Sequence, residues 1–353
     1  MVAVRVAGLA CAIACGACGR FGVDGSAAPG DGSAAPGDDS AAPGDGSIAD
    51  AIDRHLHVAD GWSIAQLVDL TGLVPYDPGD FTDGTERRAN DPSYTAALYS
   101  PFDASLVVIA GRSLIALADD GSAVVHSYRP ADFNTTGPDA PGRATFADLG
   151  AGGAGLWLTS ASMEGGDGLY LITSDWSISV VSTENNTYPL ALDPAGDYDM
   201  QGSAALYYGS QGTLQRRIGA QLATIVTPPG AVNDLATKGN ALFLTIEGDA
   251  QVLLDRVGPG QSPVISELAR SADIELAEGS TNAGLFGIID NAALVTISPR
   301  DGAFVRDAWT DDPDWVWRSV CVPRAGNRFA GSLIVLESNR RLDQDRLLLV
   351  IPP

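Results

Sequence analysis

Short apolar runs separated by Gly, Asp, Asn and Pro fill the chain from about residue 51 to its end. The clearest repeat has an offset of 86 residues and lays residues 147–159 (ADLGAGGAGLWLT) over residues 233–245 (NDLATKGNALFLT). In this alignment Asp148 matches Asp234, and the apolar run that follows each of them ends on a threonine. The chain is therefore expected to repeat one structural unit rather than to form unrelated segments.

Looser copies of the same pattern give six units. Each unit has a second apolar run marked by a leucine, and successive leucines lie 50, 50, 36, 43 and 48 residues apart: Leu106, Leu156, Leu206, Leu242, Leu285 and Leu333. At least one further strand pattern follows each leucine. Four short strands in a unit of roughly 40–50 residues are typical of a β-propeller blade. The pattern predicts an all-β fold, a single β-propeller of six four-stranded blades, with five or seven blades left open.

The end of the chain raises the question of how such a ring closes. The last unit stops at residues 345–353 (DRLLLVIPP), after its third recognisable strand. Because an open edge strand exposes unpaired backbone groups, the first and last blades should be joined. Residues 62–72 (WSIAQLVDLTG) could supply the closing strand, although part of this segment, 63–70, is also the best match in the chain to a helical period.

The N-terminus has the features of an export signal. Arg5 precedes a nine-residue apolar run, 6–14, which is far shorter than the roughly 20 residues that span a bilayer. Cys15 and Cys18 follow among small residues. This arrangement resembles a bacterial lipoprotein signal, in which cleavage occurs before a cysteine that carries diacylglycerol. The resemblance implies that Cys15 is lipidated, with Cys18 as the alternative, and an ordinary secretory signal without lipid stays open.

A low-complexity tract separates this signal from the repeats. Residues 24–44 contain three near-copies of D-G-S-A-A-P-G and no large apolar side chain. Such a tract cannot bury enough surface to offset the entropy lost on ordering. We therefore expect a signal peptide and anchor over residues 1–18, a disordered linker over 19–50 and the propeller domain over 51–353. The lipoprotein resemblance implies an extracytoplasmic protein tethered to a bacterial membrane, at the outer membrane or the cell surface.

The charge balance narrows the choice of partners. Asp and Glu total 44 against 21 Lys and Arg, for a net charge of −23. A surface of this sign repels nucleic-acid phosphates and anionic lipid. We expect a monomer that binds a protein or carbohydrate ligand at the cell envelope and meets the membrane only through its lipid.

One blade also resembles a known group of propellers. The phrase from Pro229 to Thr245 is similar to blades of the NHL and lactonase-like families. Lactonase-like enzymes hold a metal in the central channel with acidic and amide ligands. The resemblance thus draws attention to three carboxylates that precede the first apolar residues of their units: Asp148, Asp234 and Glu275. They are candidates for ligand binding and for a divalent cation such as calcium. The full ligand set of that family is not matched, and solvated strand starts are the alternative.

Two tryptophans complete the set of candidates. Trp315 and Trp317 precede the last unit and could stack on a sugar ring or pack between blades. Gly150, Gly152 and Gly155 spell G-x-G-x-x-G, but they lead into a strand rather than a helix, so a turn is expected instead of a dinucleotide site. No catalytic residue is predicted. The expected function is a binding or scaffold module, and the alternative is a propeller hydrolase or lyase that uses a channel-bound divalent metal.

Overall fold

The computed structural model describes residues 4–5, 53–71, 73, 94–103, 105–110, 113–118, 122–128, 132, 140–161, 168–183, 190–198, 202–210, 212–247, 252–258, 264–271, 273–277, 284–323, 328–339, 341–342 and 344–353. These residues form strands joined by turns, with short 3-10 segments such as η1 (Asp53–His55) and η4 (Gly150–Gly152). No helix among them is long and apolar enough to cross a membrane.

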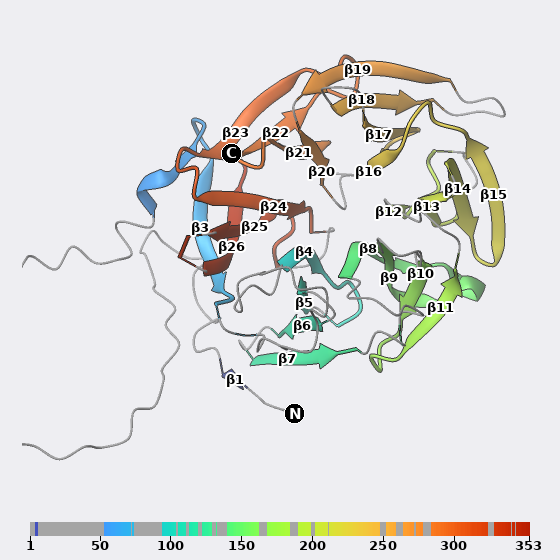
Figure 1. The fold of residues 1–353 in the computed structure, drawn as a ribbon, viewed down its shortest axis with the longest axis horizontal. Coiled ribbons are helices and arrows are strands. Elements are labelled where there is room, and N and C mark those ends of the chain that lie inside the picture. Colours follow the sequence, from blue (N-terminus) through green and yellow to red (C-terminus); the bar gives the residue numbers. More distant parts are fainter. Residues whose placement is uncertain are drawn as a thin grey trace, which may run out of the picture.

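Six antiparallel sheets stand around a central axis as the blades of a propeller (Figure 1). Blade 1 is β4 (Tyr94–Tyr99), β5 (Leu106–Ala110), β6 (Ser113–Leu117) and β7 (Ser122–Ser127), with β1 (Val4–Arg5) paired to β7. Blade 2 is β8 (Ala140–Asp148), β9 (Ala154–Ala161), β10 (Gly168–Ile172) and β11 (Ile178–Ser182). Blade 3 is β12 (Leu190–Asp193), β13 (Ala205–Ser210), β14 (Thr213–Ile218) and β15 (Gln221–Val226).

The remaining blades follow the same order, with the first strand innermost. Blade 4 is β16 (Val232–Lys238), β17 (Ala241–Glu247), β18 (Val252–Val257) and β19 (Ile265–Ser271). Blade 5 is β20 (Ile274–Leu276), β21 (Phe286–Ile289), β22 (Ala293–Ile297) and β23 (Phe304–Thr310), with β2 (Leu56–Val58) outside β23. Blade 6 is β24 (Trp315–Cys321), β25 (Leu333–Asn339), β26 (Gln344–Ile351) and β3 (Ser63–Asp69). The predicted count of six four-stranded blades is confirmed.

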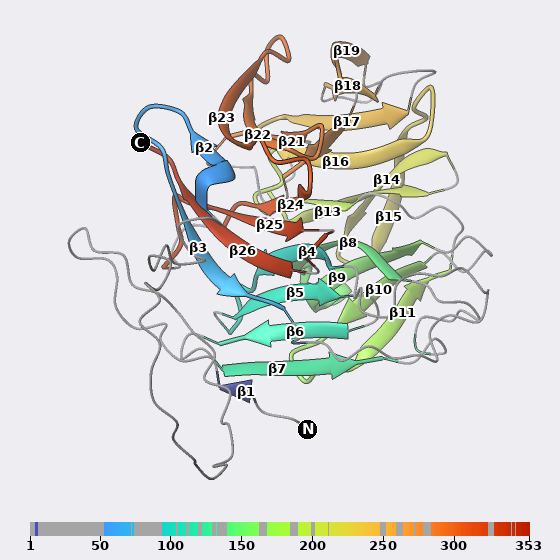
Figure 2. The same cartoon turned by 60° about the vertical axis from the view of Figure 1, so that its left-hand side comes forward.

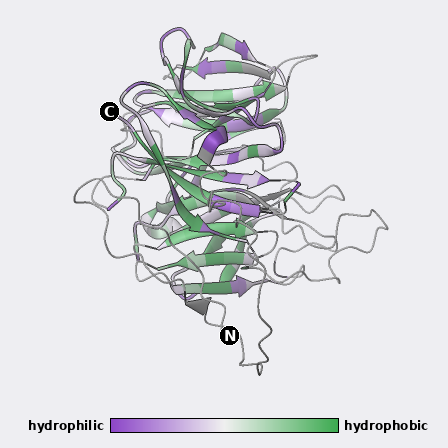
Figure 3. Ribbon diagram, turned by 90° about the vertical axis from the view of Figure 1, so that its left-hand side faces the viewer, coloured by the Kyte–Doolittle hydropathy of each residue, from purple (hydrophilic) through white to green (hydrophobic). Residues whose placement is uncertain are grey.

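The leucines that marked the repeat have a common place in the ring. Five of them lie in the second strand of a blade, and Leu285 immediately precedes β21. All six are nearly inaccessible to solvent, with at most 3% of their surface exposed. Each second strand is covered on both faces by neighbouring blades, so it reads as a continuous apolar run rather than an alternating one. Figure 3 shows hydrophobic residues concentrated along the strands of the ring.

The N-terminal strand β3 closes the ring by completing blade 6. It pairs antiparallel with β26, with Val68 opposite Leu347 and Ile64 opposite Val350, and the two strands run side by side in Figure 2. The Leu70 amide extends the pairing by donating to the Asp345 carbonyl at 2.8 Å. The predicted closing strand is confirmed, and the helical period in the same segment does not form a helix.

The short strand β2 ties the same N-terminal segment to the neighbouring blade. It pairs with β23 of blade 5, placing Leu56 opposite Thr310 and Val58 opposite Ala308. Residues 56–69 therefore hold the outer strands of blades 5 and 6 together. This segment is the seam of the ring.

Removing the seam should destabilise the ring, whereas removing the preceding tract should not. A chain that lacks residues 1–46 loses only the two-residue pairing of β1 with β7, so we expect it to melt close to the full chain. A chain that lacks residues 1–72 loses β2 and β3, exposes the edge of β26 and should melt lower by about 10 °C or more. Differential scanning calorimetry of both truncations measures this difference, and equal melting temperatures would contradict N-terminal closure.

Candidate functional site

Charged side chains from three blades meet in the central channel. Arg143 on β8 donates from Nη1 to Glu275 Oε1 at 2.7 Å and from Nη2 to Asp234 Oδ2 at 2.9 Å. Blade 2, which carries Arg143, does not adjoin blades 4 and 5, which carry the two acids. The contacts must therefore cross the channel. We call Arg143, Asp234 and Glu275 the channel triad.

The strand register explains why these three residues lie at one level. Asp234 pairs with Thr245 in β17. In blade 2, Ala144 pairs with Leu158, so that the preceding Arg143 lies beside Thr159 and donates its amide to Thr159 Oγ1 at 3.1 Å. Thr159 is the residue that matches Thr245 in the sequence repeat. Arg143, and not Asp148, is therefore the structural counterpart of Asp234.

Asp148 lies at the other end of β8, away from the triad. It pairs with Ala154 at the turn into β9 and accepts the Gly150 amide on Oδ1 at 2.9 Å. This turn is longer than its counterpart in blade 4, where Lys238 already pairs with Ala241. The extra residues include Gly153, whose φ of 105° favours glycine. The structure thus brings two of the three predicted carboxylates together, and the G-x-G-x-x-G segment forms the turn into β9, as expected.

Backbone amides also hold the two triad carboxylates in place. Asp234 is 4% exposed at its side chain, and it accepts the Leu235 amide on Oδ1 at 2.8 Å and the Leu276 amide on Oδ2. Leu276 follows Glu275 directly, so this second bond joins blade 4 to blade 5. The side chains of Glu275 and Arg143 are 18% and 22% exposed. Within the channel triad, Arg143 and Glu275 are thus partly accessible to solvent, whereas Asp234 is not.

Burial shifts the titration of both acids. Loss of hydration raises the pKa of Glu275 to about 7; the Arg143 guanidinium opposes this rise and the Asp234 carboxylate adds to it. Loss of hydration likewise raises the pKa of Asp234, against the effect of Arg143. Two carboxylates share one guanidinium, so the triad carries a net charge of −1 when both acids are ionised. A bound proton would neutralise it.

The triad does not fit the channel metal that the lactonase-like resemblance implied. Across the part of the chain that the structure describes, no three His, Cys, Asp or Glu side chains are grouped as metal ligands. Between Asp234 and Glu275, where a cation would lie, the structure has the Arg143 guanidinium. The positive charge in this channel is a side chain of the protein.

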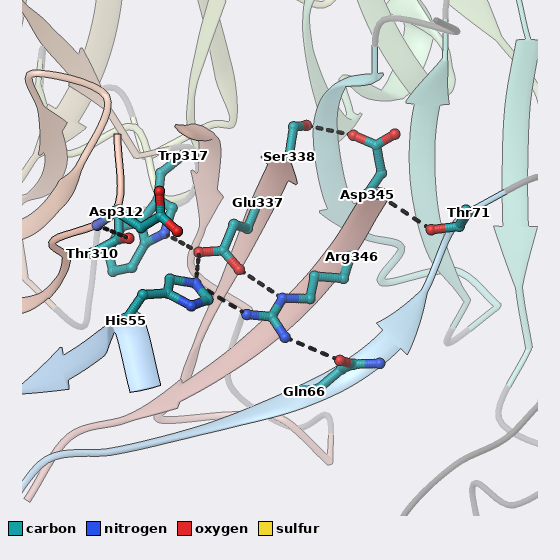
Figure 4. Close-up of polar contacts among 10 residues, drawn as sticks. All are labelled: His55, Gln66, Thr71, Thr310, Asp312, Trp317, Glu337, Ser338, Asp345 and Arg346. Carbon is teal, nitrogen blue, oxygen red and sulfur yellow. Dashed lines mark hydrogen bonds and ion pairs between the residues drawn. The ribbon is translucent and has the colours of Figure 1, made fainter. Parts of the chain in front are cut away.

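A second polar cluster lies beneath the seam, in blade 6 (Figure 4). Glu337 is fully buried and accepts the Trp317 indole Nε1 on Oε1 at 2.9 Å and Arg346 Nε on Oε2 at 2.6 Å. Arg346 also donates from Nη1 to Gln66 Oε1 of β3 at 3.2 Å. The ion pair joins β25 to β26, and the hydrogen bond from Arg346 to Gln66 attaches the closing strand β3 to this pair in addition to its backbone bonds.

His55, just before β2, completes this seam cluster. Its ring stacks on Trp315 with centroids 4.8 Å apart and planes 8° apart. Nε2 lies 3.3 Å from Glu337 Oε1 and 3.4 Å from Arg346 Nη2. Arg346 can only donate, so the first contact requires a proton on Nε2 and the second a lone pair. His55 can satisfy one of these two contacts at a time.

The two candidate tryptophans belong to this cluster. Trp315 is 5% exposed and Trp317 is 0% exposed. Trp315 is covered by His55 on one side, and the Arg346 guanidinium carbon lies 4.5 Å from its ring centroid. Neither ring is open to a sugar, and the packing alternative describes them both.

Comparisons with known proteins bear on the fold. No protein-family model matches the chain, and no curated protein matches its sequence. Among solved structures, a protein assigned as a gluconolactonase has a TM-score of 0.55 at 12% identity, covering 83% of this chain and 93% of that chain. A gluconolactonase from Xanthomonas campestris has a TM-score of 0.52 at 10% identity, covering 75% and 87%. These likenesses show the fold, a β-propeller.

Sequence reasoning missed Arg143 and His55. Arg143 precedes the aligned segment 147–159. The alignment matches the second strands of blades 2 and 4, and the turn before the second strand is longer in blade 2, so residues of the two first strands are matched out of register. The sequence nevertheless marks Arg143 as unusual: it stands 16 residues before Thr159, in a chain with only 21 Lys and Arg residues. For His55, the pairing with Glu337 spans 282 residues and has no local pattern.

The pKa of Glu275 predicts a pH dependence of stability. Because its folded pKa of about 7 lies above its ordinary 4.5, the folded state binds the extra proton between these values. The stabilisation from this group is full below pH 4.5 and is lost as the pH rises through 7. We expect Glu275→Gln to flatten this part of the curve of unfolding free energy against pH, measured by urea titration. An unchanged slope would contradict the assignment.

The buried ion pair predicts a large cost for removing its acid. Glu337→Ala leaves the Arg346 charge buried and the Trp317 indole without its acceptor, and should destabilise the fold by about 3–5 kcal/mol. The matched control is Glu267→Ala, which breaks the exposed pair of Glu267 with Arg270 and should have a much smaller effect, because water screens exposed charges. Chemical denaturation measures both, and similar costs would contradict a structural role for the seam cluster.

Proposed function

We propose that this chain is a lipid-tethered, extracytoplasmic propeller that serves as a binding or scaffold module at a bacterial envelope. Its ligand would be a protein or a carbohydrate. The support for the tether comes from the N-terminal sequence, where Cys15 follows a short apolar run and a Gly/Ala/Pro/Asp tract leads to the ring. Cys15 and Cys18 lie outside the described residues.

The channel triad is the observation that carries the choice of a scaffold over an enzyme. In the lactonase-like reading, Asp234 and Glu275 would hold a metal that activates the substrate. Here Arg143 engages both acids at 2.7 and 2.9 Å and joins three blades across the channel. Residues committed to each other in this way hold the ring together, which favours a role in which the rim and faces of the propeller bind a partner.

The path of the chain is consistent with a tether. Residues 53–69 are fixed to the ring by β2, β3 and the buried His55. A pull on the preceding tract would be borne by paired strands of two blades. The attachment therefore suits a domain that is held from its N-terminal side.

The enzyme alternative has a direct test. We expect the purified protein to hydrolyse aldonolactones no faster than buffer, with or without calcium, manganese or zinc. Turnover that depends on an added metal and disappears in Asp234→Asn would overturn the proposed scaffold role in favour of the hydrolase alternative.

The tether is tested in bacteria. We expect Cys15→Ser to abolish labelling by a fatty-acid analogue and to move the protein from the membrane fraction to the soluble fraction, because the acyl chains supply the membrane affinity. Cys18→Ser is the matched control and should keep both label and membrane location. Loss of label only in Cys18→Ser would move the lipid to that residue, and label in neither parent nor variants would overturn the lipoprotein proposal.

A further inference from the structure

The channel triad has the composition of a cation site in which the cation is covalently part of the protein. The Arg143 guanidinium lies within hydrogen-bond distance of carboxylate oxygens from two different blades. Both acids are mostly buried, at 4% and 18% side-chain exposure. Two such carboxylates repel each other strongly unless a positive charge lies between them.

A further oxygen on the strand opposite Asp234 has no hydrogen-bond partner among the described residues. Thr245 lies directly opposite Asp234 in the β16–β17 register, so their side chains share a face of the sheet with Cβ atoms about 5 Å apart. The Thr245 hydroxyl is buried and has no hydrogen-bond partner among the described residues. Its counterpart in blade 2, Thr159, exchanges hydrogen bonds with the Arg143 backbone instead.

We infer that Arg143 is a built-in replacement for a channel cation, and that the oxygens of Asp234, Glu275 and Thr245 become a divalent-cation site when its side chain is removed. The ion would be a hard one, such as calcium or manganese, because every protein ligand is an oxygen and water can complete the shell. This inference builds on the proposed scaffold role of the triad.

The charge balance explains why a divalent ion could take the place of the Arg143 guanidinium. With Arg143 present, the triad carries a net charge of −1 when both acids are ionised. A divalent ion without the guanidinium would bring the sum to zero and would span the same blades. The ring is thereby stable without any ion, and one substitution should make its stability depend on an added ion.

The test is a set of thermal melts of the full chain with Arg143→Ala. In wild type, millimolar calcium or manganese should leave Tm unchanged relative to sodium chloride of equal ionic strength. Arg143→Ala should melt lower than wild type and recover about 2–4 °C with either ion. Millimolar methylguanidinium, which restores the missing group, should give a similar recovery. Isothermal titration should show one calcium per Arg143→Ala chain and none for wild type.

Two controls separate a cation site from general loss of charge. Arg270→Ala removes an exposed arginine that pairs with Glu267, and it should gain no response to divalent ions. The double variant Arg143→Ala/Glu275→Gln lacks one ligand and should lose the calcium response.

Several results would overturn the inference. These are a folded Arg143→Ala with no response to divalent ions, an equal response in wild type, or an undiminished response in the double variant. If Arg143→Ala does not fold in sodium chloride, its refolded yield should rise with calcium, and a yield independent of calcium would overturn the inference as well. None of these outcomes bears on the proposed tether, because the fractionation experiment tests the tether in a chain that keeps Arg143.

Discussion

Pairing of β3 with β26 is the contact on which the rest of this structure depends. Six sheets can surround a common axis only if the last is joined to the first, since otherwise the edge of β26 and the apolar faces beside it would meet water. The chain solves this with residues from its N-terminal side, which also add β2 to blade 5. The buried pair of Glu337 and Arg346, with His55 stacked on Trp315, then holds the seam from within.

Closure has a consequence at the centre of the ring. It forces the first strands of all blades to face one another, so charged residues at one level must be compensated within a narrow space. Arg143 balances the negative charge of Asp234 and Glu275 from a blade that is not adjacent to either of their blades. These ion pairs therefore tie blade 2 to blades 4 and 5. The structural neighbours assigned as gluconolactonases share the β-propeller fold.

Much of the fold was predictable because its signals are local. Apolar runs covered on both faces mark each second strand, and a missing fourth strand at the C-terminus indicated closure from the N-terminal side. The site was predictable only in part. The repeat places Asp148, Asp234 and Glu275 at equivalent positions, but only Asp234 and Glu275 meet in the channel, because the turn after β8 is longer than the turn after β16. A repeat alignment matches residues by their order in the sequence, whereas the residues that meet in the channel are set by strand register. When a turn differs in length between two blades, the two criteria select different residues.

Hydrogen exchange at the seam tests the central claim, closure by β3, most directly. Native-state exchange measured amide by amide reports the opening free energy of each hydrogen bond. The amides of β3 that face β26, and the Leu70 amide that donates to Asp345, should be protected to the same degree as those of β25 within the blade. Rapid exchange of the β3 and Leu70 amides while β25 stays protected would show that the ring is held closed by other contacts, and would contradict this account.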